Sequence, residues 1–391
     1  MNSRERIISV MEGKETDVVP VELFFSTEAI CGVSGIPPYK FLYQDVNYRT
    51  RAQLACVERF KPDSFILWAK GRTSNWIKNH DVEIKNNGEA YLIEKESGKK
   101  YKLGSNYHAQ YRDSIPPREK PFIMHGEIEV IVNGQQFMTM DDKYPISSKE
   151  DIDRLFPLEQ AASVKQRGFW DTLKLFKKQC DPGLYVEAGG VGSVFRLAVG
   201  ILGLNSGFIM INENPELLKY LLNRMMEQEM EYLKVVKDYG ADGIHTGEIW
   251  TGSDMISPQV YDEFSFPYQK ELVAEAKHLG LMVKYYLTGN VVPRLEKLLE
   301  MDIDALHVEE TFNIDIADVR KRVGNDIALV GNLDAINLLE KGLKEDIIKK
   351  VKHQIDVAGK DGRFITSTGS CVTMHTDPER IDLLINTSHG Y

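Results

Sequence analysis

Glu248 is the acidic residue of this sequence whose position best suits chemistry. It ends a short GIHTGE run with the composition of a buried strand, and residues at the ends of such strands commonly form active sites. Its carboxylate could bind a metal ion or act as a general acid, or it could cap the next helix. Side chains alternate along a strand, so we expect Ile244 and Thr246 to share the inward side with Glu248. His245 should then pack toward the surrounding helices.

Aromatic side chains stand at the ends of several predicted strands. They could stack on the ring of an aromatic substrate, because flat rings pair with one another. The residues that we assign to this role are Phe24, Trp68 and Trp250. Asn332 and Asp334 follow a later strand in the sequence GNLD, where they could orient polar groups of a substrate or equally serve as turn residues.

These residues need elements that place them together, and the sequence predicts a repeated unit. Eight short runs rich in β-branched or aromatic residues lie at 18–25, 63–68, 184–187, 242–248, 281–287, 304–309, 327–331 and 364–368. In the second half, helical patterns at 257–279, 292–300, 315–323 and 345–358 follow the runs. Strands that alternate with helices form a parallel sheet, and eight units close into a (β/α)8 TIM barrel of the α/β class.

One segment breaks the alternation. Residues 76–145 contain the alternating run AYLIEKESGKKYKL and an Asn-Gly pair at 133–134, which are both signals of hairpins. We interpret this segment as a β-rich insertion after the second strand, where it would form a lid. Residues 1–391 are then one domain that contains the insertion.

Composition limits the possible partners and location. The net charge is −10 and no cluster of Lys and Arg is visible, which argues against nucleic acid or an anionic membrane as a partner. Four scattered cysteines are too few for a disulfide framework in 391 residues, and no apolar run is long enough to span a bilayer. The first residues lack the pattern of a signal peptide, so we expect a cytoplasmic protein.

An ordered set of short motifs resembles the uroporphyrinogen decarboxylase superfamily. They are SRER and GKETDVVPV near the start, YGADGI at 239–244, ISP at 256–258, LVGNLD at 329–334, GSC at 369–371 and DPE at 377–379. Each motif is short, but their order and spacing match together over most of the chain outside the insertion. The resemblance implies the same barrel that the alternation predicts.

The decarboxylase branch of that superfamily carries an arginine-rich signature after the first strand, which holds the carboxylates of its tetrapyrrole. Here the segment 24–32 reads FFSTEAICG and has no arginine, with Glu28 among its residues. Guanidinium groups are the natural partners of carboxylates, so we expect a different substrate.

The resemblance is closer to the corrinoid-dependent methyltransferases, whose thiol-methylating members bind zinc through His-x-Cys-Gly after the fifth strand and a later Cys. The matching positions are Tyr286 to Gly289, which lack both ligands, and Cys371, which keeps one. We therefore expect Zn²⁺ bound by Glu248 and Cys371, although a lone buried cysteine is commonly only a small apolar residue. Tyr286 could donate a hydrogen bond to a leaving oxygen, or be a half-buried strand aromatic.

The resemblance implies an O-demethylase component, an enzyme that transfers a methyl group from a methoxylated aromatic of the guaiacol or vanillate type to cobalt(I). The corrinoid would come from a partner corrinoid protein, because the cobalamin-binding pattern D-x-H-x-x-G is missing here. A thiol methyltransferase, a decarboxylase or lyase of the same fold, and a non-catalytic corrinoid-binding protein stay open as alternatives. The sequence leaves the choice between monomer and homodimer open as well.

Overall fold

The structure is a computed structural model of the chain, and it describes residues 1–103, 146–310, 314–360 and 362–391. At its centre, parallel strands form one sheet in the order β1-β2-β6-β7-β8-β9-β10-β11. Their bounds are Glu22–Leu23, Ser64–Trp68, Tyr185–Gly189, Gly243–Glu248, Met282–Leu287, Ala305–Val308, Ala328–Val330 and Phe364–Ile365. A bridge between Val21 and Thr366 joins the last strand to the first, so the sheet closes. The predicted (β/α)8 barrel is confirmed.

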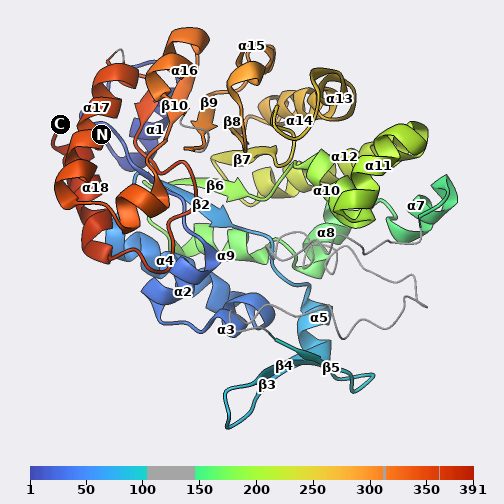
Figure 1. Cartoon of the computed structure of the whole chain (residues 1–391). Coiled ribbons are helices and arrows are strands. Elements are labelled where there is room, and N and C mark those ends of the chain that lie inside the picture. The colour runs from blue at the N-terminus through green and yellow to red at the C-terminus, as the bar shows by residue number, and fades with distance from the viewer. Residues whose placement is uncertain (104–145, 311–313, 361) are drawn as a thin grey trace.

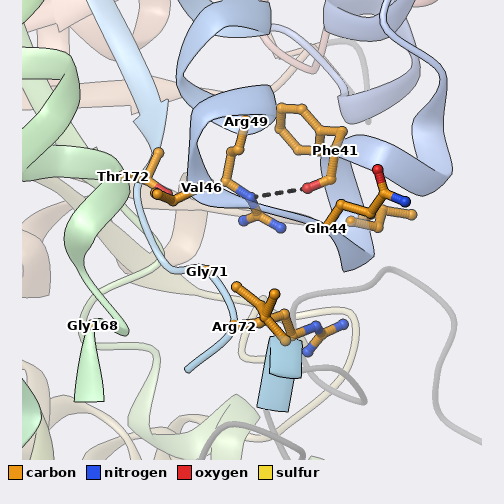
Figure 2. A pocket seen from close by; sticks show the side chains of 10 residues that line it. Phe41, Gln44, Val46, Arg49, Gly71, Arg72, Gly168 and Thr172 are labelled. Atoms are coloured by element: carbon orange, nitrogen blue, oxygen red, sulfur yellow. Dashed lines mark hydrogen bonds between the residues drawn. The ribbon is translucent and has the colours of Figure 1, made fainter. Parts of the chain in front are cut away.

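Helices surround the strands, as Figure 1 shows. Before the third barrel strand they are α1 Ser3–Met11, α2 Thr27–Ser34, α3 Pro38–Tyr43, α4 Val46–Phe60, α5 Ser74–Asn79, α7 Lys149–Leu155, α8 Ala161–Arg167 and α9 Asp171–Gln179. After it follow α10 Val194–Leu202, α11 Leu204–Glu213, α12 Pro215–Asp238, α13 Pro258–Phe264, α14 Phe266–His278, α15 Leu295–Leu298, α16 Ile316–Val323, α17 Lys344–Ala358 and α18 Pro378–His389. A 3-10 helix, η2 Val292–Arg294, and a π-helix, η4 Ala335–Glu340, complete the described set.

The helix predicted over 257–279 is two helices. α13 ends at Phe264 and α14 begins at Phe266, with Ser265 between them in a non-helical conformation. Pro267 lies in the first turn of α14, where a proline fits because its missing N–H would have no partner inside the helix. The helical period continues across the break, so periodicity alone predicted one element.

Part of the predicted insertion forms a small antiparallel sheet. Strands β3 His80–Ile84, β4 Ala90–Glu94 and β5 Lys100–Lys102 pair in sequence order, and Figure 1 shows them at the edge of the molecule beyond α5. The second hairpin signal, the Asn-Gly pair at 133–134, lies outside the described residues. The lid role of 76–145 therefore stays a prediction.

The first helix covers the end of the barrel at which the strands begin. Asn2 caps α1, and the apolar face of this helix packs against inward side chains of the strands, including Tyr185. The opposite end, where the strands reach their carboxyl termini, is therefore the end that can admit a ligand. Within the described residues no single helix is long and apolar enough to cross a membrane, while the bent pair α10 and α11 meets that test only when both are taken together.

Candidate active site

Lys284 on β8 identifies the interior of the barrel. Its ammonium contacts the carboxylates of Glu22 on β1 and Glu187 on β6, and neither strand is a neighbour of β8 in the sheet. Only a side chain that points into the barrel can reach both. His245 on β7 is level with Lys284, and side chains that are level on adjacent parallel strands share a face. His245 therefore also points inward.

The predicted orientation of β7 is wrong. Ile244, Thr246 and Glu248 face the helices, and His245 faces the interior. The Thr246 hydroxyl donates to the carbonyl of Val191, outside the barrel. Alternation separated the two sets of side chains correctly. The layer between strands and helices is mainly apolar, whereas the interior beyond the residues that α1 covers holds charged and aromatic groups.

Glu248 acts as a buried cap of a helix start. Its carboxylate accepts hydrogen bonds from the backbone N–H of Phe195 (2.9 Å) and Arg196 (3.2 Å) in the first turn of α10, and from Nε2 of Gln269 (2.6 Å). Burial raises the pKa of Glu248 to about 8. The capping interpretation that the sequence left open fits these contacts, because each carboxylate oxygen already has a partner.

A cluster of rings fills the upper part of the barrel around Phe24. The centroid of its ring lies 6.0 Å from Trp68, 5.2 Å from His245, 5.9 Å from Tyr286 and 5.7 Å from His307. These residues come from four strands and from the residue after β1. We call this set the ring cluster, and it forms an aromatic wall at the end of the barrel that can admit a ligand.

Two histidines of the ring cluster are hydrogen-bonded to each other. Nε2 of His245 lies 3.1 Å from Nδ1 of His307, and Nε2 of His307 lies 2.8 Å from the carbonyl oxygen of Thr368. Burial lowers the pKa of His307 to about 4, and burial, the neighbouring imidazole and Lys284 lower that of His245 well below its ordinary value. Both imidazoles are therefore neutral at neutral pH.

An ionic layer lies directly below the rings. The ammonium of Lys284 is 2.8 Å from the Glu187 carboxylate and also contacts Glu22, whose other partner is the hydroxyl of Ser64 at 2.9 Å. Burial raises the pKa of Glu187 while Lys284 lowers it, and the net shift is upward. Burial lowers the pKa of Lys284 while the two carboxylates raise it, and the net shift is upward. The layer therefore keeps its cation charged, and burial favours the protonated form of Glu187.

Tyr286 and Trp68 are the partly exposed members of the ring cluster. The indole N–H of Trp68 donates to the carbonyl of Phe25 (2.9 Å), which fixes its ring. The hydroxyl of Tyr286 makes a long contact of 3.5 Å with Glu309, whose other oxygen accepts from the N–H of Gly289 at 2.7 Å. Burial raises the pKa of Tyr286 well above its ordinary value, so its phenol stays protonated and can donate a hydrogen bond.

The other predicted substrate-binding residues have structural partners. Asn332 donates to the carbonyl of Ile314 (3.0 Å), and Asp334 accepts from two backbone N–H groups at the start of η4. These contacts favour the turn interpretation for Asp334, whereas Asn332 is held by the carbonyl of a distant segment of the chain. Trp250 follows β7 with a positive φ of 65° and packs against the main core. Among the described residues no ring contact joins it to the ring cluster.

The profile of the family described as Uroporphyrinogen decarboxylase (URO-D) matches residues 139–391. The chain belongs to this family. A relative named uroporphyrinogen decarboxylase from Myxococcus xanthus (strain DK1622) is 28% identical over 256 residues, which are 63% of this chain and 70% of that protein. One of the same name from Pseudomonas entomophila (strain L48) is 32% identical over 208 residues, 52% of this chain and 54% of that protein.

A solved structure of this fold covers nearly the whole chain. It is the methyltransferase from Methanosarcina mazei, which aligns over 99% of this chain and 98% of its own with a TM-score of 0.65 and 16% sequence identity. At this identity the likeness shows that the fold is shared. The alignment extends beyond the segment 139–391 that the URO-D profile matches, so the first strands also belong to the same barrel.

The residues that we expected to hold zinc do not fit a zinc site. Glu248 faces the helices, whereas Cys371 lies near Tyr286 and the acids Glu28 and Glu310. Burial and these acids raise the pKa of the Cys371 thiol, which opposes the thiolate that zinc requires. No group of three or more metal-binding side chains comes together among the described residues. We therefore derive no step through a metal.

The sequence did not predict that His245, His307, Lys284 and Glu22 point into the barrel. One signal was present, because Lys284 interrupts the apolar run MVKYYL in the middle of a strand. A charged residue at such a position is commonly paired with another buried charge. The partners come from distant segments, so no local pattern identifies them.

Proposed function

We propose that this member of the URO-D family is a methyltransferase, which takes the methyl group of a methoxylated aromatic to the cobalt(I) of a separate corrinoid protein. In this reaction the bond between the methyl carbon and the ether oxygen breaks, and the oxygen keeps the electron pair. The phenolate then takes up a proton from solvent. The corrinoid supplies the nucleophile, and this chain must bind the arene and stabilise the leaving oxygen.

The ring cluster carries the proposal. Phe24, Trp68 and Tyr286 form an aromatic wall, and an arene can stack on the partly exposed rings of the latter two. Tyr286 is the member of this wall that can donate a hydrogen bond to a phenolate oxygen, because its pKa is raised and its contact with Glu309 is long. A donor that is aimed at developing charge contributes about 100- to 1,000-fold in rate at other oxyanion sites.

A decarboxylase of uroporphyrinogen is the second candidate, because the curated relatives at 28–32% identity carry that name. Such a substrate carries many carboxylates and calls for guanidinium groups. The segment 24–32 that follows β1 has no arginine, and its acid Glu28 lies close to Cys371. This charge distribution is unfavourable for a polyanion.

The experiment mixes the purified chain with cob(I)alamin, or with a corrinoid protein and a reductant, and a panel of methyl ethers. We expect guaiacol or vanillate to give the absorbance of methylcobalamin and a demethylated phenol. An aliphatic methyl ether and a Tyr286→Phe variant serve as controls, and both should give much less. Uroporphyrinogen is tested in parallel. Decarboxylation of uroporphyrinogen, or no methyl transfer from any phenolic ether in the presence of the corrinoid protein, would refute the proposal.

A further inference from the structure

We propose that Nδ1 of His245 is a neutral hydrogen-bond acceptor at the substrate site, which selects methyl ethers that keep a free phenolic hydroxyl next to the methoxy group. This inference rests on the proposed function and deepens it, since it names which arenes the site takes. It follows from a series of hydrogen bonds that determines which nitrogen of each imidazole carries the proton.

The chain begins at the backbone carbonyl of Thr368, which can only accept. His307 contacts it through Nε2 at 2.8 Å, so this nitrogen carries the proton. In a neutral imidazole the other nitrogen, Nδ1, then has the lone pair. His245 approaches that lone pair with its own Nε2 at 3.1 Å, so this Nε2 carries the proton of the second ring. Nδ1 of His245 is consequently left as an acceptor.

The assignment requires both rings to be neutral. Protonation of His307 would place a hydrogen on its Nδ1 and reverse the direction of the chain. Burial holds the pKa of His307 at about 4, and the ammonium of Lys284 below disfavours a second positive charge. Glu22 is the nearest acid, and its oxygen lies 3.9 Å from Nδ1 of His307, which is too far for a hydrogen bond. The neutral form therefore prevails at neutral pH.

His245 keeps a small exposed surface within the ring cluster. Its side chain packs between Phe24 at 5.2 Å and Tyr286 at 5.4 Å between centroids, and the residue is 7% exposed. No described residue forms a hydrogen bond with its Nδ1. The donor hydroxyl of Tyr286 and the acceptor of His245 therefore lie on adjacent rings. An arene with two neighbouring oxygens can use both, with the methoxy oxygen at Tyr286 and the hydroxyl at His245.

The proposal predicts a strong preference. A phenolic hydroxyl donates to Nδ1, whereas a second methoxy group has no hydrogen to donate and leaves the buried acceptor without a partner. We expect guaiacol to exceed 1,2-dimethoxybenzene in kcat/KM by about ten- to a hundredfold. His245→Phe keeps a flat ring but removes the acceptor. In this variant the rate with guaiacol should fall while that with 1,2-dimethoxybenzene changes little, so the preference collapses.

The test measures both ethers with the wild type, His245→Phe and a control, His353→Phe, which changes an exposed histidine of α17. The control should keep the preference. Equal turnover of the two ethers by the wild type would overturn the inference while the proposed function stands. Turnover of neither ether would refute the proposed function instead. In that case binding calorimetry still tests His245. Guaiacol must bind the wild type more tightly than 1,2-dimethoxybenzene does, and His245→Phe must lose this difference.

Nitrogen NMR of the histidine-labelled wild type supplies a readout that needs no variant to fold. We expect His245 and His307 as neutral rings with the proton on Nε2, and a shift of the His245 Nδ1 signal when guaiacol is added. A proton on Nδ1 of His245 in the free protein would overturn the inference. Loss of folding in His245→Phe, checked by circular dichroism, leaves the substrate comparison and the NMR result to decide.

Discussion

Replacing Glu248 by glutamine should make stability less dependent on pH. The carboxyl group is buried against the first turn of α10, and burial raises its pKa from 4.5 to about 8 in the folded protein. The folded state thus holds the proton more tightly than the unfolded state does. For the wild type, this group's contribution to the free energy of unfolding is full below about pH 4.5 and declines as the pH rises to about 8. Glutamine cannot ionise and lacks this decline.

The size of the effect follows from the pKa shift. The stability of E248Q relative to the wild type should grow by about 1.4 kcal/mol for each pH unit inside the window, or about 2 to 3 kcal/mol between about pH 5.5 and about pH 7.5. One cost does not vary with pH. In the wild type the backbone N–H of Arg196 donates to Glu248 over 3.2 Å. The NH2 group of the glutamine would take the place of that accepting oxygen and cannot accept, so the hydrogen bond is lost at a cost of about 1 kcal/mol. E248Q should therefore be the less stable protein at the acid end and the more stable one near neutrality.

Urea denaturation at a series of pH values, followed by circular dichroism, measures the difference. Glu271→Gln, at an exposed position of α14, is the matched control and should show no crossing. A difference between E248Q and the wild type that stays constant with pH would refute the linkage argument. The variant should also keep methyl-transfer activity within a few-fold. A loss of several orders of magnitude in a folded E248Q protein would instead restore Glu248 as a catalytic group.

Three further outcomes follow from the interior of the barrel. Lys284→Met should lower the free energy of unfolding by about 3 to 5 kcal/mol, because it leaves the carboxyl groups of Glu22 and Glu187 buried without their cation. Urea denaturation measures this change, and a loss below about 1 kcal/mol would contradict the prediction. Tyr286→Phe should lower kcat with a phenolic methyl ether by at least about tenfold and change the melting temperature little, and an unchanged kcat would remove Tyr286 from the mechanism. Phe24→Leu should raise KM for aromatic ethers roughly two- to tenfold through the lost ring contact, with binding calorimetry as the check.

The fold could be predicted because its signals are local. Each strand is a short run of β-branched or aromatic residues, and the helices after them carry a clear period, as in α16 Ile316–Val323 and α17 Lys344–Ala358. Strict alternation of the two element types leaves few arrangements, and eight repeats favour a closed barrel. Phe24, Trp68 and Tyr286 could be placed at strand ends for the same reason, and they meet in the ring cluster. Trp250, which was predicted with them, does not join it.

The tertiary structure alone decided which face of each strand looks inward. Alternation along β7 separates His245 from Glu248 without saying which of them enters the barrel, because that depends on how the closed sheet curves. Lys284 is tolerated in the centre only because Glu22 and Glu187 meet it there, and these residues lie 262 and 97 positions away in the chain. A buried charge and its partners are joined by closure of the barrel and not by neighbouring sequence, so the chemistry of the interior becomes visible only once the strands are assembled.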